Sequence, residues 1–166
     1  MPFQQIKLLA FTAIILALFI SPVCGITLSE ETESYYNERG LSSFNEGFYK
    51  LLPRGMKEAA AIEFEDAIGF FKKALEIKGD FTEARRNLAR VYCIREDYAR
   101  AVEEYKKVVN RTPDDMDARL AMASAYAKMG RPDEAIEELT IARDMNDNPI
   151  VIDKLDRLIE SINSGK

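Results

Sequence analysis

A 34-residue periodicity is the strongest constraint on what this 166-residue chain can fold into. Residues 82–115 align without a gap with residues 116–149, and a partial copy lies one period earlier, at residues 66–80. Repeats of this length form arrays in which each unit packs mainly on its neighbours. The matched positions are Ala84 with Ala118, Arg85 with Arg119, Ala89 with Ala123, Tyr92 with Tyr126, Ala101 with Ala135, and Glu103-Glu104 with Glu137-Glu138.

Each unit has the apolar pattern of two short helices joined by a turn. In the first aligned unit Ala84, Leu88 and Tyr92 recur at helical spacing, and the second half of the unit repeats this pattern. Asp80, followed three residues later by Glu83, predicts a capping box where the first of these helices begins. Turn-forming residues separate the predicted helices at 95–97, 112–114 and 130–132.

A helical hairpin of this length, with Ala-x₂-Tyr in its first helix and Ala-x₃-Tyr in its second, resembles the tetratricopeptide repeat (TPR). Arg85 and Arg119 depart from the family pattern, since they stand where tryptophan is usual, and Asp147 replaces the terminal proline. The resemblance implies an all-α fold, a TPR-type solenoid of about three hairpins followed by a capping helix. The predicted boundaries are 32–81, 82–115 and 116–149 for the hairpins and 150–166 for the capping helix and tail.

The first hairpin is predicted to be longer than the other two. Gly40 and Ala67 are 27 positions apart, whereas the corresponding residues Ala89 and Ala101 are 12 apart, so this hairpin holds fifteen additional residues. These residues carry helical apolar stripes, with a predicted turn at 53–55. We therefore expect each helix to be extended by about two turns, at roughly 3.6 residues per turn, and to project beyond the stack as a helical tip.

The segment after residue 149 predicts a final helix. Asn148-Pro149 is a helix start signal, and the apolar residues that follow share one helical face. A solenoid needs a terminal element that covers its last open face and turns polar side chains outward, so we interpret this helix as a cap. Its apolar face consists of Ile152, Leu155, Ile159 and Ile162.

The first 25 residues have the layout of a secretory signal peptide. Lys7 precedes an uncharged apolar run at residues 8–20, and the small residue Gly25 ends the segment. We therefore expect residues 1–25 to be a signal peptide, residues 26–31 to be a linker, and the protein to be exported, with the periplasm as the expected compartment. Two alternatives stay open, an uncleaved membrane anchor over residues 6–23 and lipidation of Cys24.

Composition excludes several classes of function. The chain has no histidine, which removes Ser/His/Asp and Cys/His nucleophile arrangements and histidine-containing zinc sites. Without residues 1–25, 22 basic and 28 acidic residues give a net charge near −6, and Cys93 is the one remaining cysteine. Neither a basic nucleic-acid surface nor an intramolecular disulfide is then expected. We predict a non-catalytic protein with no cofactor, no metal and no nucleic-acid partner.

The TPR resemblance implies a concave groove lined by the first helices of successive repeats. Arg86 and Arg90, one turn apart, are predicted to hold a partner carboxylate by bidentate hydrogen bonds. The alternative is that both arginines pair with Glu83 or Asp117. The predicted partner-binding groove consists of Asn37, Leu41, Phe44, Arg86, Asn87, Arg90, Cys93, Ile94, Leu120, Ser124 and Lys128.

Two features that resemble chemical sites are given structural interpretations. Adjacent carboxylates such as Glu103-Glu104 and Glu137-Glu138 point in different directions on a helix, so we interpret them as solvated faces. Cys93 lies near Arg90, which is expected to lower the pKa of its thiol somewhat. Because no histidine can activate it, we interpret Cys93 as a lining residue of the groove.

The resulting functional prediction is an interaction adaptor or scaffold that binds a peptide or helix of another protein in the groove. The alternative is a self-assembling structural component, a homo-oligomer formed through the extended first hairpin or the C-terminal helix. Contact with a membrane is expected only through the N-terminal segment, if that segment is uncleaved or lipidated.

Overall fold

The computed structural model describes residues 31–165, so the predicted signal peptide and most of the predicted linker lie outside the described residues. Within residues 31–165 the chain forms seven α-helices and no β-strand, which confirms the all-α prediction. None of these helices is both long and apolar enough to cross a membrane. The α-helices are α2 (Glu33–Asn45), α3 (Lys57–Ile77), α4 (Thr82–Ile94), α5 (Tyr98–Arg111), α6 (Met116–Lys128), α7 (Pro132–Asp144) and α8 (Pro149–Asn163).

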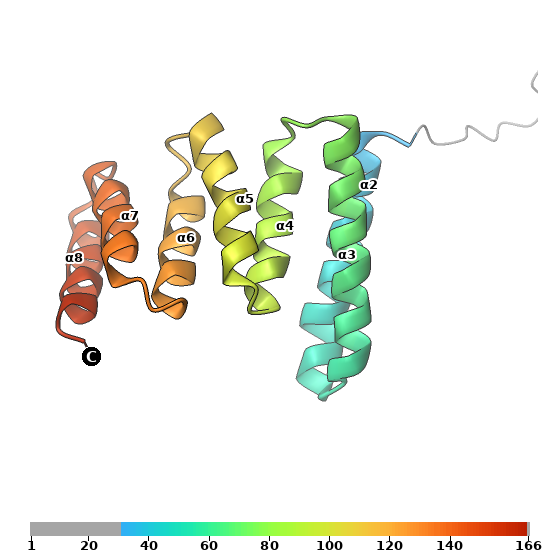
Figure 1. Cartoon of the computed structure of the whole chain (residues 1–166), viewed down its shortest axis with the longest axis horizontal. Helices are drawn as coiled ribbons and strands as arrows, with labels where there is room; N and C mark the ends of the chain where they lie inside the picture. Colours follow the sequence, from blue (N-terminus) through green and yellow to red (C-terminus); the bar gives the residue numbers. More distant parts are fainter. Residues whose placement is uncertain (1–30, 166) are drawn as a thin grey trace, which may run out of the picture. The chain divides into compact units, whose positions relative to one another are not determined.

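The helices of residues 31–165 form hairpins that stack side by side (Figure 1). α2 packs on α3, α4 on α5, α6 on α7, and α8 packs on α7. Successive hairpins meet through α3 and α4 and through α5 and α6, and the first helices also touch one another, α2 with α4 and α4 with α6. The first helices therefore form one layer of the stack, which is the arrangement of a TPR-type solenoid.

Polar side chains set the starts of several helices. The side chains of Thr32, Asp97, Asp115 and Asn148 accept a backbone N–H at the starts of α2, α5, α6 and α8 respectively. The predicted capping box before α4 is wrong, because Phe81 is the residue at the helix start and its side chain accepts no hydrogen bond. Asp80 pairs instead with Arg111, and Glu83 accepts a hydrogen bond from Asn37.

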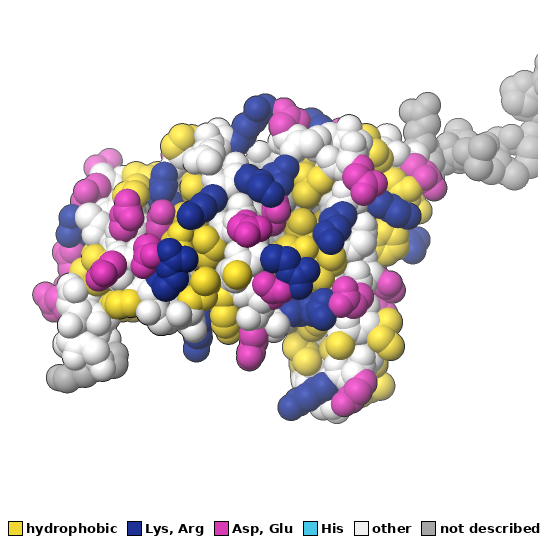
Figure 2. Space-filling view, in the orientation of Figure 1, with side chains coloured by type: hydrophobic (Ala, Val, Ile, Leu, Met, Phe, Trp, Pro, Cys, Tyr) yellow, Lys and Arg dark blue, Asp and Glu magenta, His cyan; other side chains and the backbone are white. Residues whose placement is uncertain are grey.

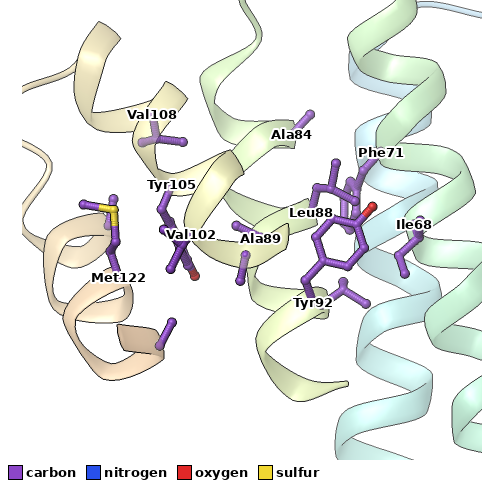
Figure 3. Packing of buried hydrophobic residues seen from close by; sticks show 14 of the residues in the cluster. Ile68, Phe71, Ala84, Leu88, Ala89, Tyr92, Val102, Tyr105, Val108 and Met122 are labelled. Atoms are coloured by element: carbon purple, nitrogen blue, oxygen red, sulfur yellow. The ribbon is translucent and has the colours of Figure 1, made fainter. Parts of the chain in front are cut away.

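Alanines and aromatic residues build the core. Ala67, Ala101 and Ala135 are fully buried at matching positions of α3, α5 and α7. Such small side chains let paired helices approach closely, while larger side chains fill the space at neighbouring turns. Figure 3 shows Leu88 and Tyr92 of α4 beside Phe71 of α3, and Val102 and Tyr105 of α5 on the side that faces Met122 of α6.

A repeated ion pair occupies the position where the family usually has tryptophan. Nη1 of Arg85 lies 2.6 Å from the Glu104 carboxylate, and Nη1 of Arg119 lies 2.8 Å from that of Glu138. Each arginine also donates to the backbone carbonyl of the preceding loop, at Gly79 and at Pro113. The four side chains are between 11% and 17% exposed. The interpretation of Glu104 and Glu138 as solvated is therefore wrong, since the arginines draw both carboxylates into the hairpin interface.

The first hairpin is built from close glycine and aromatic contacts. A Cβ atom on Gly40 would lie 2.5 Å from the ring of Phe71, and one on Gly47 would lie 2.9 Å from the ring of Phe64. Both distances are too short for any real side chain, so only glycine lets the two helices pack at this separation. The helix α3 has 21 residues, whereas α4 to α7 have 13 or 14.

The tip of the first hairpin, which we define as residues 48–57, extends beyond the ends of α4 and α5 (Figure 1). A π-helical segment, η1 (Glu46–Leu51), continues α2, and a 3₁₀ turn, η2 (Leu52–Arg54), leads to Gly55. Gly55 has φ 74°, a conformation that glycine adopts at little cost. Apolar side chains gather on the tip (Figure 2), and the exposed ones are Phe48, Tyr49 and Met56.

The final helix covers the end of the stack. Leu155 of α8 is buried against Leu139 and Ala142 of α7, and Arg143 of α7 pairs with Asp156 of α8 at 3.1 Å. The outer face is less polar than a cap is expected to be. Two apolar side chains on α8 remain exposed, Ile150 and Leu158.

Candidate functional site

A pocket of about 660 Å³ opens on the layer formed by the first helices. Most of its lining comes from α4, where residues 83, 86, 87 and 90 share one helical face. Single residues of α2 and α5 and two residues of α6 complete it. The lining consists of Leu41, Glu83, Arg86, Asn87, Arg90, Tyr105, Asp117 and Ala121.

The structure brings part of the predicted groove together at this pocket. Four predicted residues line it, namely Leu41, Arg86, Asn87 and Arg90. Two further predicted residues contact the residues that line the pocket. Asn37 forms hydrogen bonds with Glu83 and Asn87, and the ring of Phe44 lies under the guanidinium of Arg90.

The remaining predicted residues lie elsewhere. Cys93 and Ile94, at the end of α4, are half-buried and pack against the core. Leu120 is half-buried against the core cluster that includes Leu155 of α8, and it is not among the residues that line the pocket. Ser124 and Lys128 are exposed on α6 and are not among the residues that line the pocket.

The predicted set omits Glu83, Tyr105, Asp117 and Ala121, which also line the pocket. Tyr105 belongs to α5, a second helix, and counting inward positions on first helices cannot find it. The sequence gives one indication of Tyr105, its position four residues after Ala101 in the repeat pattern. That pattern predicts a packing residue between helices and does not predict a pocket residue.

A hydrogen-bonded chain of amides forms the floor of the pocket. Asn87 Nδ2 donates to Asn37 Oδ1 at 3.1 Å, and Asn37 Nδ2 donates to Glu83 Oε1 at 3.1 Å. Asn37 is 4% exposed and Asn87 is 8% exposed. Buried amides require partners of this kind. The hydrogen bond from Asn37 holds the Glu83 carboxylate in place. Within residues 31–165, Glu83 forms no ion pair with Arg86 or Arg90.

The two arginines have different surroundings. Arg86 pairs with Asp115, whose side chain is 6% exposed and also caps α6. The alternative that Arg86 pairs with Glu83 or Asp117 is therefore wrong in its partner, although Arg86 does pair with an acid of the chain. The Nε atom of Arg86 is buried and has no hydrogen-bond partner within residues 31–165.

Arg90 is an exposed cation held over an aromatic ring. Its guanidinium carbon lies 4.9 Å from the centroid of the Phe44 ring, a cation–π geometry. Within residues 31–165, Arg90 forms no ion pair with a carboxylate. The N–H groups of the Arg90 guanidinium can therefore donate to a carboxylate of another molecule.

The Cys93 thiol and the Tyr105 phenol, which lines the pocket, both have raised pKa values. Burial raises the pKa of the Cys93 thiol, and a hydrogen bond with Tyr105 offsets this only in part. The expectation that Arg90 lowers this pKa is wrong. Burial also raises the pKa of Tyr105. A thiol with a raised pKa is a poor nucleophile, so the pocket offers packing and hydrogen bonding.

The described residues also contain no group of three or more acidic or cysteine side chains placed to hold a metal.

Comparison with known proteins agrees with this geometry. A family model described as tetratricopeptide repeat matches residues 94–155, from the end of α4 into α8. Residues 94–155 are therefore identified as tetratricopeptide repeat sequence, and residues 31–165 have the fold of a TPR solenoid. Its three hairpins and its layer of first helices are the features of this family.

The curated relatives of this chain share part of their length with it. The Ycf3 photosystem I assembly protein of Synechococcus sp. (strain CC9605) is 32% identical over 104 residues, which are 62% of this chain and 52% of that protein. The 131 kDa subunit of transcription factor tau from Saccharomyces cerevisiae is 32% identical over 74 residues, 44% of this chain and 7% of the subunit. The chain therefore spans about half the length of the Ycf3 relative and a small part of the tau subunit.

Solved structures with a similar fold include TPR proteins bound to peptides. The Yersinia enterocolitica type III secretion translocator chaperone SycD superposes with a TM-score of 0.63 at 15% identity, covering 84% of this chain and 90% of SycD. The first TPR domain of Spaghetti (RPAP3) bound to the HSP90 peptide SRMEEVD has a TM-score of 0.58 at 15% identity, covering 78% and 94%. PcrH in complex with the chaperone-binding region of PopD has a TM-score of 0.56 at 14% identity, covering 73% and 94%.

Proposed function

We propose that this TPR protein is a non-catalytic adaptor that holds a peptide or helix of another protein in the groove of α2, α4 and α6. The observation that carries the proposal is Arg90, which projects into a pocket of about 660 Å³, is held over Phe44, and has no carboxylate partner within residues 31–165. Similar solved TPR proteins bound to an HSP90 peptide and to a region of PopD support the proposal by analogy of fold.

The pocket offers complementary groups to a peptide. Arg90 can accept an aspartate or glutamate side chain, or a C-terminal carboxylate, in a bidentate arrangement. Leu41 and Ala121 offer apolar contact on either side of the arginine. Asp117 lies exposed at the rim, where it would repel a second acidic residue placed near α6. The favoured ligand therefore carries one acidic group near α4 and no acid near the start of α6.

Photo-crosslinking in the source cells tests the groove. A photoreactive amino acid placed at Asp117 or Ala121 lines the pocket on α6 and leaves Arg90 in place, whereas the matched control positions Lys72 and Lys107 are exposed on the second helices α3 and α5. Adducts with a partner protein are expected at the first two positions. Adducts that form only at Lys72 and Lys107 would place the binding surface on the opposite layer and reject the groove.

The proposal also includes export. It is supported by the apolar run at residues 8–20 and the small residue Gly25 that follows it. Mass spectrometry of the N-terminus of the protein from its source cells tests this directly. A chain that begins at Ile26 supports signal-peptide cleavage, a lipidated Cys24 supports a lipoprotein, and an intact Met1 supports an uncleaved anchor or a protein that is not exported.

Self-assembly is the second candidate function, and the exposed apolar side chains of the tip and of α8 favour it. Phe48, Tyr49 and Met56 on the tip, with Ile150 and Leu158 on α8, are partly or largely exposed. Light scattering over a wide range of protein concentration distinguishes the candidates. A constant monomer mass supports the adaptor, whereas a dimer that is lost in a Leu158→Gln or Tyr49→Gln variant supports assembly.

A further inference from the structure

A continuous line of ring contacts leads from the pocket to the tip. The guanidinium of Arg90 covers Phe44, and the rings of Phe44 and Phe48 stack with centroids 5.6 Å apart and planes 13° apart. Phe48 in turn meets the ring of Tyr49 edge-on, with centroids 5.0 Å apart. Leu41, Phe44 and Phe48 follow one another at helical spacing, so the face of α2 that lines the pocket continues along η1.

The far end of this line is open because the second hairpin is shorter than the first. The solvent-exposed fraction of the residue rises along this line, from 3% for Phe44 to 37% for Phe48 and 61% for Tyr49. Arg90 covers the first ring, but α4 ends at Ile94, and the tip extends past the ends of α4 and α5 (Figure 1). Within residues 31–165 Phe48 is only partly covered and Tyr49 is largely exposed. Adjacent aromatic side chains of this kind indicate a contact surface, since their burial would remove much apolar area from water.

We propose that this aromatic shelf, formed by Phe48 and Tyr49 and backed by Phe44, is a second subsite of the groove. It takes an aromatic or long aliphatic side chain from the same partner segment whose carboxylate binds Arg90. The inference rests on the proposed adaptor function and adds the chemistry of the partner, an acidic segment with a large apolar residue beside its acid.

Charge at the tip favours an acidic partner. Lys50, Arg54 and Lys57 are exposed around the turn, and two acidic residues flank them, Glu46, which is 2.5 Å from Lys50, and Glu58, which is exposed next to Lys57. Residues 46–58 therefore carry three basic and two acidic side chains, a net charge of +1, whereas the whole chain has a net charge of −5. A basic apolar tip also suits an anionic membrane, but the unbroken ring contacts to the pocket join the shelf to the groove and favour a peptide.

A random peptide library supplies the probe while the natural partner is unidentified. Phage-displayed 12-residue peptides are selected on the purified full-length chain, and the dissociation constants of the best synthetic peptides are measured by fluorescence anisotropy. Selected peptides are expected to carry an aspartate or glutamate with an aromatic or long aliphatic residue at a constant spacing. Replacing that apolar residue by alanine is expected to weaken binding at least about tenfold, as for other buried aromatic anchors.

Variants of the protein separate the shelf from the groove. Phe48→Gln with Tyr49→Gln is expected to weaken peptide binding at least about tenfold, and Arg90→Gln is expected to do the same. Ile62→Gln is the matched control, because Ile62 is a 64% exposed apolar residue on α3 of the same hairpin, outside the ring contacts. Unchanged circular dichroism and thermal unfolding show that each variant is folded.

The outcomes distinguish the two proposals. Binding that depends on Arg90 but is unchanged in the shelf variant overturns the shelf and leaves the adaptor groove in place. Binding that neither variant changes rejects the groove itself. Unchanged peptide binding, together with loss of a dimer or of binding to phosphatidylglycerol vesicles in the shelf variant, also overturns the inference, because the shelf would then serve a second copy or a membrane.

Discussion

The two helices of the first hairpin are held together by different contacts from those in the two hairpins that follow it. In the second and third hairpins an arginine of the first helix reaches a glutamate of the second, Arg85 to Glu104 and Arg119 to Glu138. In the first hairpin Gly40 and Gly47 bring the helices so close that the rings of Phe71 and Phe64 lie against the backbone. An ion pair holds the short hairpins, and close apolar packing holds the long one.

This difference shows how a repeat array acquires a distinct end. Each short hairpin is covered by its neighbour, so its inner face can remain small and partly polar. Among the described helices the long hairpin has no neighbour of equal length, and its inner face therefore ends in exposed aromatic side chains. The exposed aromatic end of this inner face therefore follows from hairpin length.

The largest expected effect is the loss of a ring from the first hairpin. Phe71 is fully buried, and Phe71→Ala is expected to lower the free energy of unfolding by about 3–5 kcal/mol, because it removes apolar contact and leaves a cavity. Urea unfolding followed by circular dichroism measures this. The control is Tyr49→Ala, at a 61% exposed ring, with an expected change below about 1 kcal/mol. Equal losses for the two variants would contradict the packing described for this hairpin.

A methyl group on Gly40 is expected to have the next largest effect. Its Cβ would lie 2.5 Å from the buried ring of Phe71, so Gly40→Ala is expected to cost about 1–3 kcal/mol despite the better helix propensity of alanine. A Cβ atom on Gly69 of α3 would meet nothing within 4 Å, and Gly69→Ala is expected to stabilise the protein by about 0.5–1 kcal/mol. Urea unfolding compares the two variants, and a stabilising Gly40→Ala would show that the first hairpin does not depend on glycine contacts.

Neutralising the glutamate of a short hairpin is expected to cost about 1–2 kcal/mol, because it leaves a largely buried arginine without its charge partner. Glu104→Gln and Glu138→Gln should give similar losses, since their arginines have equivalent surroundings. Glu103→Gln, one residue earlier and exposed, should change stability by less than about 0.5 kcal/mol. Denaturant unfolding of the three variants tests the comparison, and a loss at Glu103 equal to that at Glu104 would contradict it.

The smallest expected effect concerns the cap of α5. A hydrogen bond from the Arg100 side chain lowers the pKa of Asp97, which also accepts the backbone N–H of Arg100. Asp97→Asn keeps a capping oxygen but loses the charge, so at neutral pH we expect a loss of about 0.5 kcal/mol. Because the folded pKa is the lower one, this difference is fully present above the unfolded value of about 3.9 and disappears as the pH falls through the folded pKa. Thermal unfolding of both proteins across this pH range measures it, and a difference that grows on acidification would contradict the assignment.

The repeat register was open to sequence reasoning because identical residues recur 34 positions apart and most of them are buried packing residues. The hydrogen-bond and ion-pair partners of individual side chains could not be predicted in the same way. The partner of Arg86 is Asp115, from the loop before α6, whereas the alternative drawn from the sequence was Glu83 or Asp117. Glu104 looked like a surface residue because its helix is exposed there, and only the long reach of Arg85 across the hairpin draws it inward. Such pairings depend on tertiary distances that residue patterns do not contain.

The aromatic shelf was only partly foreseeable. The fifteen extra residues of the first hairpin predict a projecting tip, and their stripes predict helices. Which apolar residues stay exposed depends on where α4 and α5 end relative to the tip, and that requires the assembled stack.

The most direct test of the groove is a nuclear magnetic resonance titration of the isotopically labelled protein with a peptide from the library selection. The groove predicts amide shift changes concentrated on the inner layer, at Asn87 and Arg90 of α4 and Ala121 of α6, and on the shelf at Phe48 and Tyr49. Changes concentrated instead on α3, α5 and α7, with the α4 amides unmoved, would contradict it.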